Sequence, residues 1–172
     1  MDTKPAVQLI PWAEGEDFVL LLRQNNSPAM TRFLGGPETD EQLADRHRRY
    51  LALSAREPAA GRMFMVIPAD GGEPVGTVGF WERDWQDEPV YETGWGIRPE
   101  FQGRGLALAA VTSLIAHART HGTRPHLHAF PGIDNAASNA VCRNAGFELL
   151  GETTFEYRGT NHRSNDWHHP LR

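Results

Sequence analysis

Residues Val90 to Thr120 read VYETGWGIRPEFQGRGLALAAVTSLIAHART, and this stretch decides the fold. Its first part has the aromatic and β-branched residues of a strand up to Ile97. Pro99 ends that strand because proline has no N–H group to donate. A glycine-rich turn follows, and then a helix with apolar residues at every third or fourth position. A strand, a glycine-rich turn and a helix, in this order, predict a site that binds phosphate through backbone atoms.

The turn has the chemistry that such a site needs. Gly103 and Gly105 have no side chains, so peptide N–H groups can approach a ligand closely. The helix that follows adds unpaired N–H groups and a partial positive charge, and Arg104 adds a permanent cation. We therefore expect a pyrophosphate site, although a tight turn that merely starts a helix is the alternative. A dinucleotide loop is excluded because Leu108 is too large for its sixth position, and the ATP/GTP loop motif is absent.

Length and composition predict one globular domain over residues 1–172, with 40% hydrophobic and 23% charged residues. The net charge of −5 argues against a nucleic-acid partner, which would favour a basic surface. Cys142 is the only cysteine, so no internal disulfide can form. The N-terminus lacks the apolar run of a signal peptide, and no apolar run is long enough to span a membrane. We expect a cytoplasmic protein with no membrane partner.

Strand and helix patterns alternate in the middle of the chain, and both ends favour antiparallel strands. This order predicts an α/β fold with a mixed sheet and helices on both faces. The segment 81–89 is polar and acidic, and we expect a loop there that lines a substrate site. The predicted strands cover 7–10, 63–68, 74–81, 90–97, 125–130, 147–150, 153–158 and 166–171, and the predicted helices cover 14–25, 40–56, 104–120 and 135–146.

Two motifs resemble a known family. Gln102-Gly103-Arg104-Gly105-Leu106-Ala107 matches the acetyl-CoA pyrophosphate loop of the GCN5-related N-acetyltransferases (GNAT), Gln/Arg-x-x-Gly-x-Gly/Ala. The second motif, Asn135-x-x-Ser138 followed by a helix ending in Gly146-Phe147, is similar to that family's other signature. The resemblance is close over roughly residues 74 to 151. It is nearest to the RimJ/RimL-type branch, which includes ribosomal-protein N-terminal acetyltransferases.

The resemblance implies the GNAT acyl-CoA N-acyltransferase fold, with a central, mostly antiparallel twisted sheet of six to seven strands. Two middle strands are expected to splay apart and to hold the pantetheine arm of acetyl-CoA, with exposed edges at residues 95–98 and 129–130. Acetyl-CoA is the implied co-substrate, and no metal is expected. The implied cofactor-binding residues are Ile97, Arg98, Gln102, Gly103, Arg104, Gly105, Leu106, Ala107, Asn135 and Ser138.

Acyl transfer requires a neutral acceptor amine, whereas an ordinary lysine is neutral in only roughly 1 of 2,500 molecules at pH 7. A base is therefore useful. The resemblance makes Glu92 the candidate base, because the family often carries a glutamate at this place; an ion-paired glutamate on the strand surface is the alternative. Asp84, Asp87 and Glu88 in the preceding segment are weaker candidates, or they attract a cationic substrate.

The leaving thiolate needs a proton donor. Much of the family uses a tyrosine at the position that Cys142 occupies here, so the chain departs from that pattern. The resemblance suggests the Ser138 hydroxyl instead, unless that residue only faces the first turn of its helix. Asn135 is expected to bind the pantetheine amides, to cap the helix, or both. Cys142 as an acylated nucleophile has little support, because no histidine base is fixed beside it.

The histidines do not predict a metal site. His126 and His128 share one strand face, and His168 and His169 add two rings, but no acidic or cysteine ligands have a matching spacing. Packing, hydrogen bonding or lining of the acceptor groove is the expected role.

The leading functional prediction is an acetyl-CoA-dependent N-acetyltransferase in which a primary amine attacks directly in a ternary complex. The acceptor is a protein N-terminal α-amine or a small-molecule amine. Because members of the family often form homodimers, the resemblance also implies a homodimer. A catalytically silent acyl-CoA-binding or interaction module and a nucleotide-dependent enzyme are the alternatives. Ribosomal protein, peptide, polyamine, aminoglycoside and amino-acid analogue all stay open as acceptors, and the acyl group is acetyl or longer.

Overall fold

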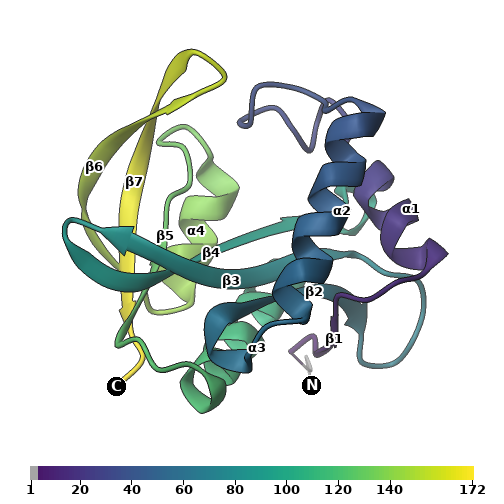
Figure 1. Ribbon diagram of the computed structural model, residues 1–172, viewed down its shortest axis with the longest axis horizontal. Coiled ribbons are helices and arrows are strands. Elements are labelled where there is room, and N and C mark those ends of the chain that lie inside the picture. Colours follow the sequence, from purple (N-terminus) through teal and green to yellow (C-terminus); the bar gives the residue numbers. More distant parts are fainter. Residues whose placement is uncertain (1–3) are drawn as a thin grey trace.

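The structure is a computed structural model that describes residues 4–172. Its seven strands form one sheet in the order β1-β2-β3-β4-β5-β7-β6, in which only the β4–β5 pair is parallel (Figure 1). No helix in the described range is long and apolar enough to cross a membrane. The strands are β1 (Val7–Pro11), β2 (Gly61–Pro68), β3 (Gly76–Trp85), β4 (Glu88–Ile97), β5 (His126–Ala129), β6 (Glu148–Tyr157) and β7 (Thr160–Pro170). The helices are α1 (Glu16–Gln24), α2 (Asp40–Ser54), α3 (Leu106–His121) and α4 (Ala136–Asn144), with short 3₁₀ turns η1 (Pro58–Ala60) and η2 (Pro99–Phe101).

Helices cover both faces of the sheet, as predicted. Along β2, Phe64 and Val66 pack in the cluster of α3 and α4, whereas Met63 and Met65 pack in the cluster of α1 and α2. This alternation follows from the two-residue period of a strand. In Figure 1, α2 lies in front of the sheet and α3 lies behind it. The mixed, mostly antiparallel α/β sheet with helices on both faces is therefore confirmed.

The β4 strand separates from β5 partway along its length. It pairs with β3 over its whole length, from Glu88 to Ile97. It pairs with β5 only from Tyr91 to Thr93, opposite Leu127 to Ala129. Residues 94–97 therefore have an open edge on the β5 side, which confirms the predicted splay of two middle strands. The exposed edge predicted at Ala129 is wrong, because this residue is paired with Thr93 of β4 and Trp167 of β7.

The prediction of a loop over residues 81–89 is wrong. The β3 strand continues to Trp85, and β4 already begins at Glu88. Gln86 and Asp87 form the connecting turn with φ angles of 50° and 64°. Two positive φ angles are typical of the type I′ hairpin turn. Neither residue is the glycine that usually marks this turn, which is why the sequence pattern did not reveal it.

Two predicted C-terminal strands are one. The segments 147–150 and 153–158 belong to the continuous strand β6, with a register shift between Leu149 and Gly151. Its partner β7 is also longer than predicted, and the hairpin turns at Arg158 and Gly159. The helices α1 to α4 begin and end within a few residues of the prediction. Thr39 caps α2 through a capping box with Gln42.

Candidate active site

The glycine-rich turn before α3 presents free backbone donors. Gly103 and Gly105 have φ angles of 77° and 76°, in the left-handed region that favours glycine. Among the residues that the structure describes, none accepts a hydrogen bond from the N–H groups of residues 103 to 108. A Cβ atom built at Gly103 would meet no atom within 4 Å. These donors therefore border open space at the positive end of a 16-residue helix, which suits an anionic group.

The side chains around this turn divide into two groups. Gln102 donates from its amide to the Ile97 carbonyl at 2.8 Å, and exposed Arg104 donates to the Glu100 carbonyl at 3.2 Å. Both side chains hold the turn. Leu106 is buried beneath it, and Ala107 is half-buried in the first turn of α3.

The Arg98 side chain lies between the β2–β3 connection and η2, where its Nε is 3.0 Å from the Glu100 carboxylate. Its guanidinium donates to the Pro74 carbonyl at 2.9 Å and lies 3.5 Å from the Glu73 carboxylate. Its backbone N–H donates to the Val75 carbonyl on the β3 side. The Arg98 and Arg104 guanidinium carbons lie 5.1 and 5.6 Å from the centroid of the same Phe101 ring, so the structure does bring Arg98 close to the turn.

The open edge of β4 presents peptide groups. Successive residues of an antiparallel strand direct their peptide groups to alternate sides. Because the Arg98 N–H faces β3, the N–H groups of Trp95 and Ile97 face the open side, where β5 does not reach them. An extended molecule that lies between the two strands can bond to these groups as an added strand would.

Glu92 lies in β4 at the closed end of the splay. Its carboxylate accepts hydrogen bonds from Trp81 Nε1 at 2.8 Å and from Arg83 at 2.6 Å. The Glu92 side chain is 17% exposed, and burial raises its pKa although Arg83 and Trp81 oppose that shift. The ion pair that sequence analysis kept as an alternative is therefore present.

Aromatic rings fix the position of Arg83. Its guanidinium carbon lies 5.3, 5.0 and 4.8 Å from the ring centroids of Trp85, Phe130 and Phe155. Such cation–π contacts favour the charged guanidinium over aromatic faces. The aromatic surroundings of Arg83 thus also fix the carboxylate of Glu92.

A buried histidine–carboxylate pair, which sequence analysis missed, adjoins Glu92. His128 is opposite Glu92 in the parallel β4–β5 register, and its Nδ1 lies 2.6 Å from Asp166 Oδ1. Trp85 Nε1 donates to the other Asp166 oxygen at 3.0 Å. On the same face, His168 Nε2 lies 2.7 Å from His126 Nδ1. The sequence predicted that His126 and His128 share a strand face. It did not predict the register of β5 with β7, which places Asp166 beside His128.

Asn135 and Ser138 lie at the start of α4. The Asn135 side chain accepts a hydrogen bond from the Ser138 N–H at 3.2 Å, so it caps the helix as predicted. The half-buried Ser138 hydroxyl has no partner among the described residues. Cys142 is fully buried in the α3–α4 core, and burial raises the pKa of its thiol to about 12. Its thiol therefore stays protonated and away from any substrate.

The weaker acidic candidates do not join the site. Asp84, Asp87 and Glu88 are all exposed at the β3–β4 turn. Asp84 lies 3.8 Å from Arg124, with its side chain 89% exposed. No group of three or more potential metal ligands was found among the described residues.

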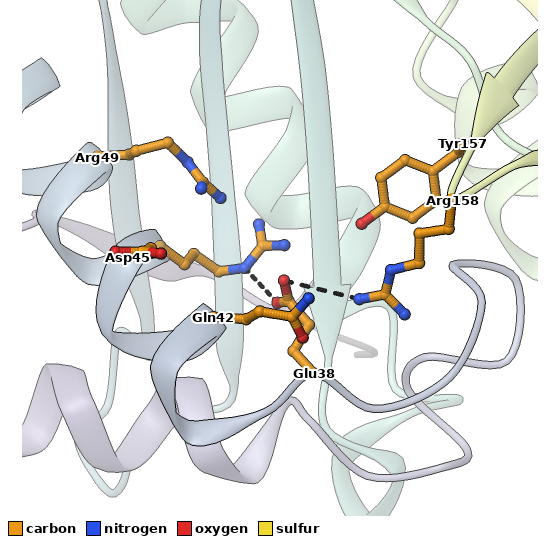
Figure 2. Close-up of a pocket in the computed structure, with 7 residues that line it drawn as sticks. Glu38, Gln42, Asp45, Arg49, Tyr157 and Arg158 are labelled. Atoms are coloured by element: carbon orange, nitrogen blue, oxygen red, sulfur yellow. Dashed lines mark hydrogen bonds and ion pairs between the residues drawn. The ribbon is translucent and has the colours of Figure 1, made fainter.

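A cleft of about 330 Å³ lies between α2 and the β6–β7 turn. Figure 2 shows Arg49 from α2 and Tyr157 from β6 pointing into it from opposite sides. Glu38 lies 2.7 Å from Arg46 and 3.9 Å from Arg158, and the hydrogen bond from Arg46 lowers the Glu38 pKa. The lining residues are Glu38, Gln42, Asp45, Arg46, Arg49, Tyr157 and Arg158.

Solved structures share this fold. An acetyl transferase from Salmonella typhimurium that modifies the N-terminal serine of ribosomal protein L7/L12 is 21% identical, with a TM-score of 0.77 over 96% of this chain and 95% of that one. A spermidine N-acetyltransferase from Vibrio cholerae, solved with CoA and spermine, is 18% identical, with a TM-score of 0.74 over 96% and 95%. The microcin C7 self-immunity acetyltransferase MccE, solved with acetyl-CoA and AMP, is 18% identical, with a TM-score of 0.76 over 96% and 92%.

The sequence itself matches a family model. A comparison with curated proteins found no match. The model described as the acetyltransferase (GNAT) domain matches residues 7–148, which is most of the chain and includes the glycine-rich turn, Glu92 and Ser138. The chain therefore belongs to the GNAT acetyltransferase family.

Proposed function

We propose that this protein is an acetyl-CoA-dependent N-acetyltransferase of the RimJ/RimL type, with one catalytic domain over residues 1–172, in which a primary amine attacks the thioester directly. The observation that carries the proposal is the set of unpartnered N–H groups at residues 103 to 108, beside the splay of β4 and β5. These groups and Arg104 would hold the pyrophosphate. The peptide groups of Trp95 and Ile97 would hold the pantetheine arm. Bound acetyl-CoA supplies an activated acetyl group at the closed end of the splay.

Two side chains supply the proton chemistry predicted from the sequence. The Ser138 hydroxyl has a free donor, so it can protonate the leaving thiolate, whereas the buried Cys142 thiol cannot reach it. Glu92, at the closed end of the splay, is the base predicted for the acceptor amine, which must lose a proton before attack.

The charge of the cleft favours an acceptor that carries a negative group near its amine. Three arginines line the cleft against two carboxylates, and Asp45 is already paired with Arg48 outside it. Among the described residues, Arg49 has no ion-pair partner. Similar proteins act on a protein N-terminus and on a polyamine. The excess positive charge supports an acidic peptide N-terminus or an amino acid over a polyamine.

A turnover experiment tests the proposal. Thiol release from acetyl-CoA is measured with three acceptors: a peptide with acidic residues after its free N-terminus, the same peptide with lysines there, and spermidine. We expect release that is fastest with the acidic peptide. CoA binding by calorimetry without release from any amine would support a silent binding module instead, and displacement of CoA by nucleotides would support a nucleotide-dependent enzyme.

We also propose a cytoplasmic homodimer that binds no nucleic acid. The edge strand β6 exposes Leu149 by 49% and Leu150 by 54%, which is the kind of apolar surface that a partner covers. Light scattering should then give about twice the 19.2 kDa of one chain. The double variant Leu149→Lys/Leu150→Lys should give the monomer mass, and an unchanged mass would place any interface elsewhere.

A further inference from the structure

We propose that His128, oriented by Asp166, is the base that takes the proton of the acceptor amine, and that Glu92 assists it as a fixed negative charge. This inference rests on the proposed function. It reassigns one step, because sequence analysis gave that step to Glu92. The structural basis is the buried pair of His128 Nδ1 and Asp166 Oδ1 at 2.6 Å, with both side chains 7% exposed.

The position of His128 fits the role. It lies in the short paired part of β4 and β5, where His128 is opposite Glu92, one pair before the strands separate. Residues opposite one another in a register share a face of the sheet. Trp81, opposite Glu92 in β3, packs with the α1–α2 cluster, so Glu92 and His128 face the side of the acceptor cleft rather than α3.

Burial raises the pKa of Glu92, but its surroundings leave neither carboxylate oxygen free to meet the acceptor amine. Its two oxygens already accept hydrogen bonds from Trp81 and Arg83. Protonation of Glu92 would remove the partner of Arg83, which three aromatic rings hold in place with only 29% of its side chain exposed. Leaving a half-buried guanidinium without its carboxylate is unfavourable, so this ion pair is expected to persist during turnover.

The hydrogen bonds of His128 leave one ring nitrogen free to take a proton. A carboxylate at Nδ1 holds the ring in the tautomer that carries its hydrogen there, which leaves the lone pair of Nε2 free. Trp85 donates to the second oxygen of Asp166 and so fixes the orientation of that carboxylate. Among the described residues, no group bonds His128 Nε2, and this atom is not sealed from solvent. The arrangement matches the base and orienting carboxylate of other acyl-transfer sites.

The proton balance is simple. The ammonium form of the acceptor gives one proton to His128 Nε2, and the neutral nitrogen then forms a bond to the thioester carbonyl carbon. The carbon–sulfur bond breaks, and the sulfur leaves with the electron pair. The second N–H proton, lost as the amide forms, reaches the thiolate through Ser138 or water. The imidazolium, stabilised by Asp166 and Glu92, finally releases its proton to solvent.

The pH dependence of turnover is the first readout. The charged and titratable groups that face His128 are Glu92 from β4, Arg83 from β3, Asp166 and His168 from β7, and His126 from its own strand. With the acidic peptide as acceptor, wild-type kcat/KM should rise with pH, because a general base must be unprotonated to accept the proton. A wild-type profile that does not change with pH overturns the inference.

Variants separate the two assignments. His128→Gln should lower kcat by roughly 10²–10⁴-fold, the usual contribution of a general base, with CoA affinity by calorimetry unchanged within about twofold. The pH rise should disappear in His128→Gln and persist in Glu92→Gln. His126→Gln, on the same strand and face, is the matched control and should keep wild-type kcat. A rise that disappears in Glu92→Gln but persists in His128→Gln returns the role to Glu92.

Chemical rescue excludes a merely structural role. His128→Ala should regain at least about tenfold in thiol release when imidazole is added, because free imidazole can occupy the vacated place and act as the base. No rescue in a variant that still binds CoA overturns the inference. Absence of thiol release by the wild type with every acceptor overturns the proposed function as well, so the two failures are distinguishable.

Discussion

Gly103 and Gly105 both adopt left-handed conformations, but their surroundings differ. A Cβ atom at Gly105 would lie 3.1 Å from Pro5 Cγ, whereas a Cβ at Gly103 would meet nothing within 4 Å. No neighbouring atom of the described protein therefore requires that position 103 lack a side chain. It leaves room beside the free N–H groups, where our account places the pyrophosphate. The motif, the turn and its exposure could all be predicted from the sequence, because each depends on neighbouring residues.

Gly103→Ala should weaken CoA binding by about tenfold, because the new methyl group occupies that room and the backbone resists the left-handed conformation. Isothermal titration calorimetry measures the effect. Gly71→Ala is the matched control, since Gly71 has a φ of 96° and equally open surroundings in the β2–β3 connection. Both variants should lose roughly 1 kcal/mol of stability. Equal CoA affinity in the two variants would contradict the assigned pyrophosphate site.

Cys142 should be unreactive in the folded protein. Its thiol is fully buried, and burial raises its pKa to about 12, so almost no thiolate forms at pH 8. We expect labelling by a disulfide reagent such as Ellman's reagent only after denaturation, with saturating CoA causing no change. Fast labelling of the native protein would show instead that this part of the α3–α4 core opens.

Among the helices and strands, features that depend on neighbouring residues were predicted correctly from the sequence. The pairing between distant strands was not. The apolar stripe of α3, the Thr39 cap and the splayed edge of β4 followed from periodicity, capping chemistry and the family resemblance. The β3–β4 turn was missed because Gln86 adopts a conformation that glycine or asparagine usually supplies. The pairing of His128 with Asp166 was missed because strands 38 residues apart must first be aligned. The sequence therefore predicted the splayed edge of β4 but not the His128–Asp166 pair.

The core side of α3 contains a pH-sensitive residue. His117 packs edge-to-face against Phe64 at 4.9 Å and Phe80 at 5.9 Å, and burial lowers its pKa from 6.5 to about 4. Because the pKa of His117 is lower in the folded state, the neutral buried ring stabilises the fold fully above pH 6.5. This stabilisation is lost as the pH falls through about 4. The free energy of unfolding should fall by up to roughly 3 kcal/mol over this window from His117 alone, an upper bound because the ring is only half-buried.

Replacement of His117 isolates the effect. His117→Leu keeps an apolar contact with the two phenylalanine rings and removes the titrating group, so its urea unfolding free energy should depend less on pH between 6.5 and 4. The same slope in the variant and the wild type would mean that other groups, such as the carboxylates, cause the acid destabilisation.

The whole molecule brings distant segments together around two openings. The loop at Gly35, helix α2 and the turn at Arg158 surround the cleft, and Arg158 donates to the Gly35 carbonyl at 3.2 Å. The splay of β4 and β5 forms the second opening, with Glu92 and His128 at its closed end. The segment 81–89, expected to line the substrate site, does not line this cleft. The sequence did not reveal the cleft or its balance of charge, because both depend on which side chains of distant segments point inward.

Reversal of charge in the cleft should change the preferred acceptor. Arg49→Glu removes the arginine without an ion-pair partner among the described residues, so kcat/KM for the acidic peptide should fall by roughly 10–100-fold and should rise for spermidine. Arg23→Glu, at an exposed position on α1 outside the cleft, is the control and should change neither value by more than about threefold. Equal effects of the two variants would place the acceptor elsewhere.

The most direct test of the central claim is a crystal structure of this protein with CoA. Our account predicts the diphosphate on the N–H groups of residues 103 to 107, and the thiol end in the splay of β4 and β5, with Glu92 and His128 on the α1–α2 face of the sheet and Ser138 at the start of α4. CoA bound at another surface, or a diphosphate that contacts none of these N–H groups, would contradict the account.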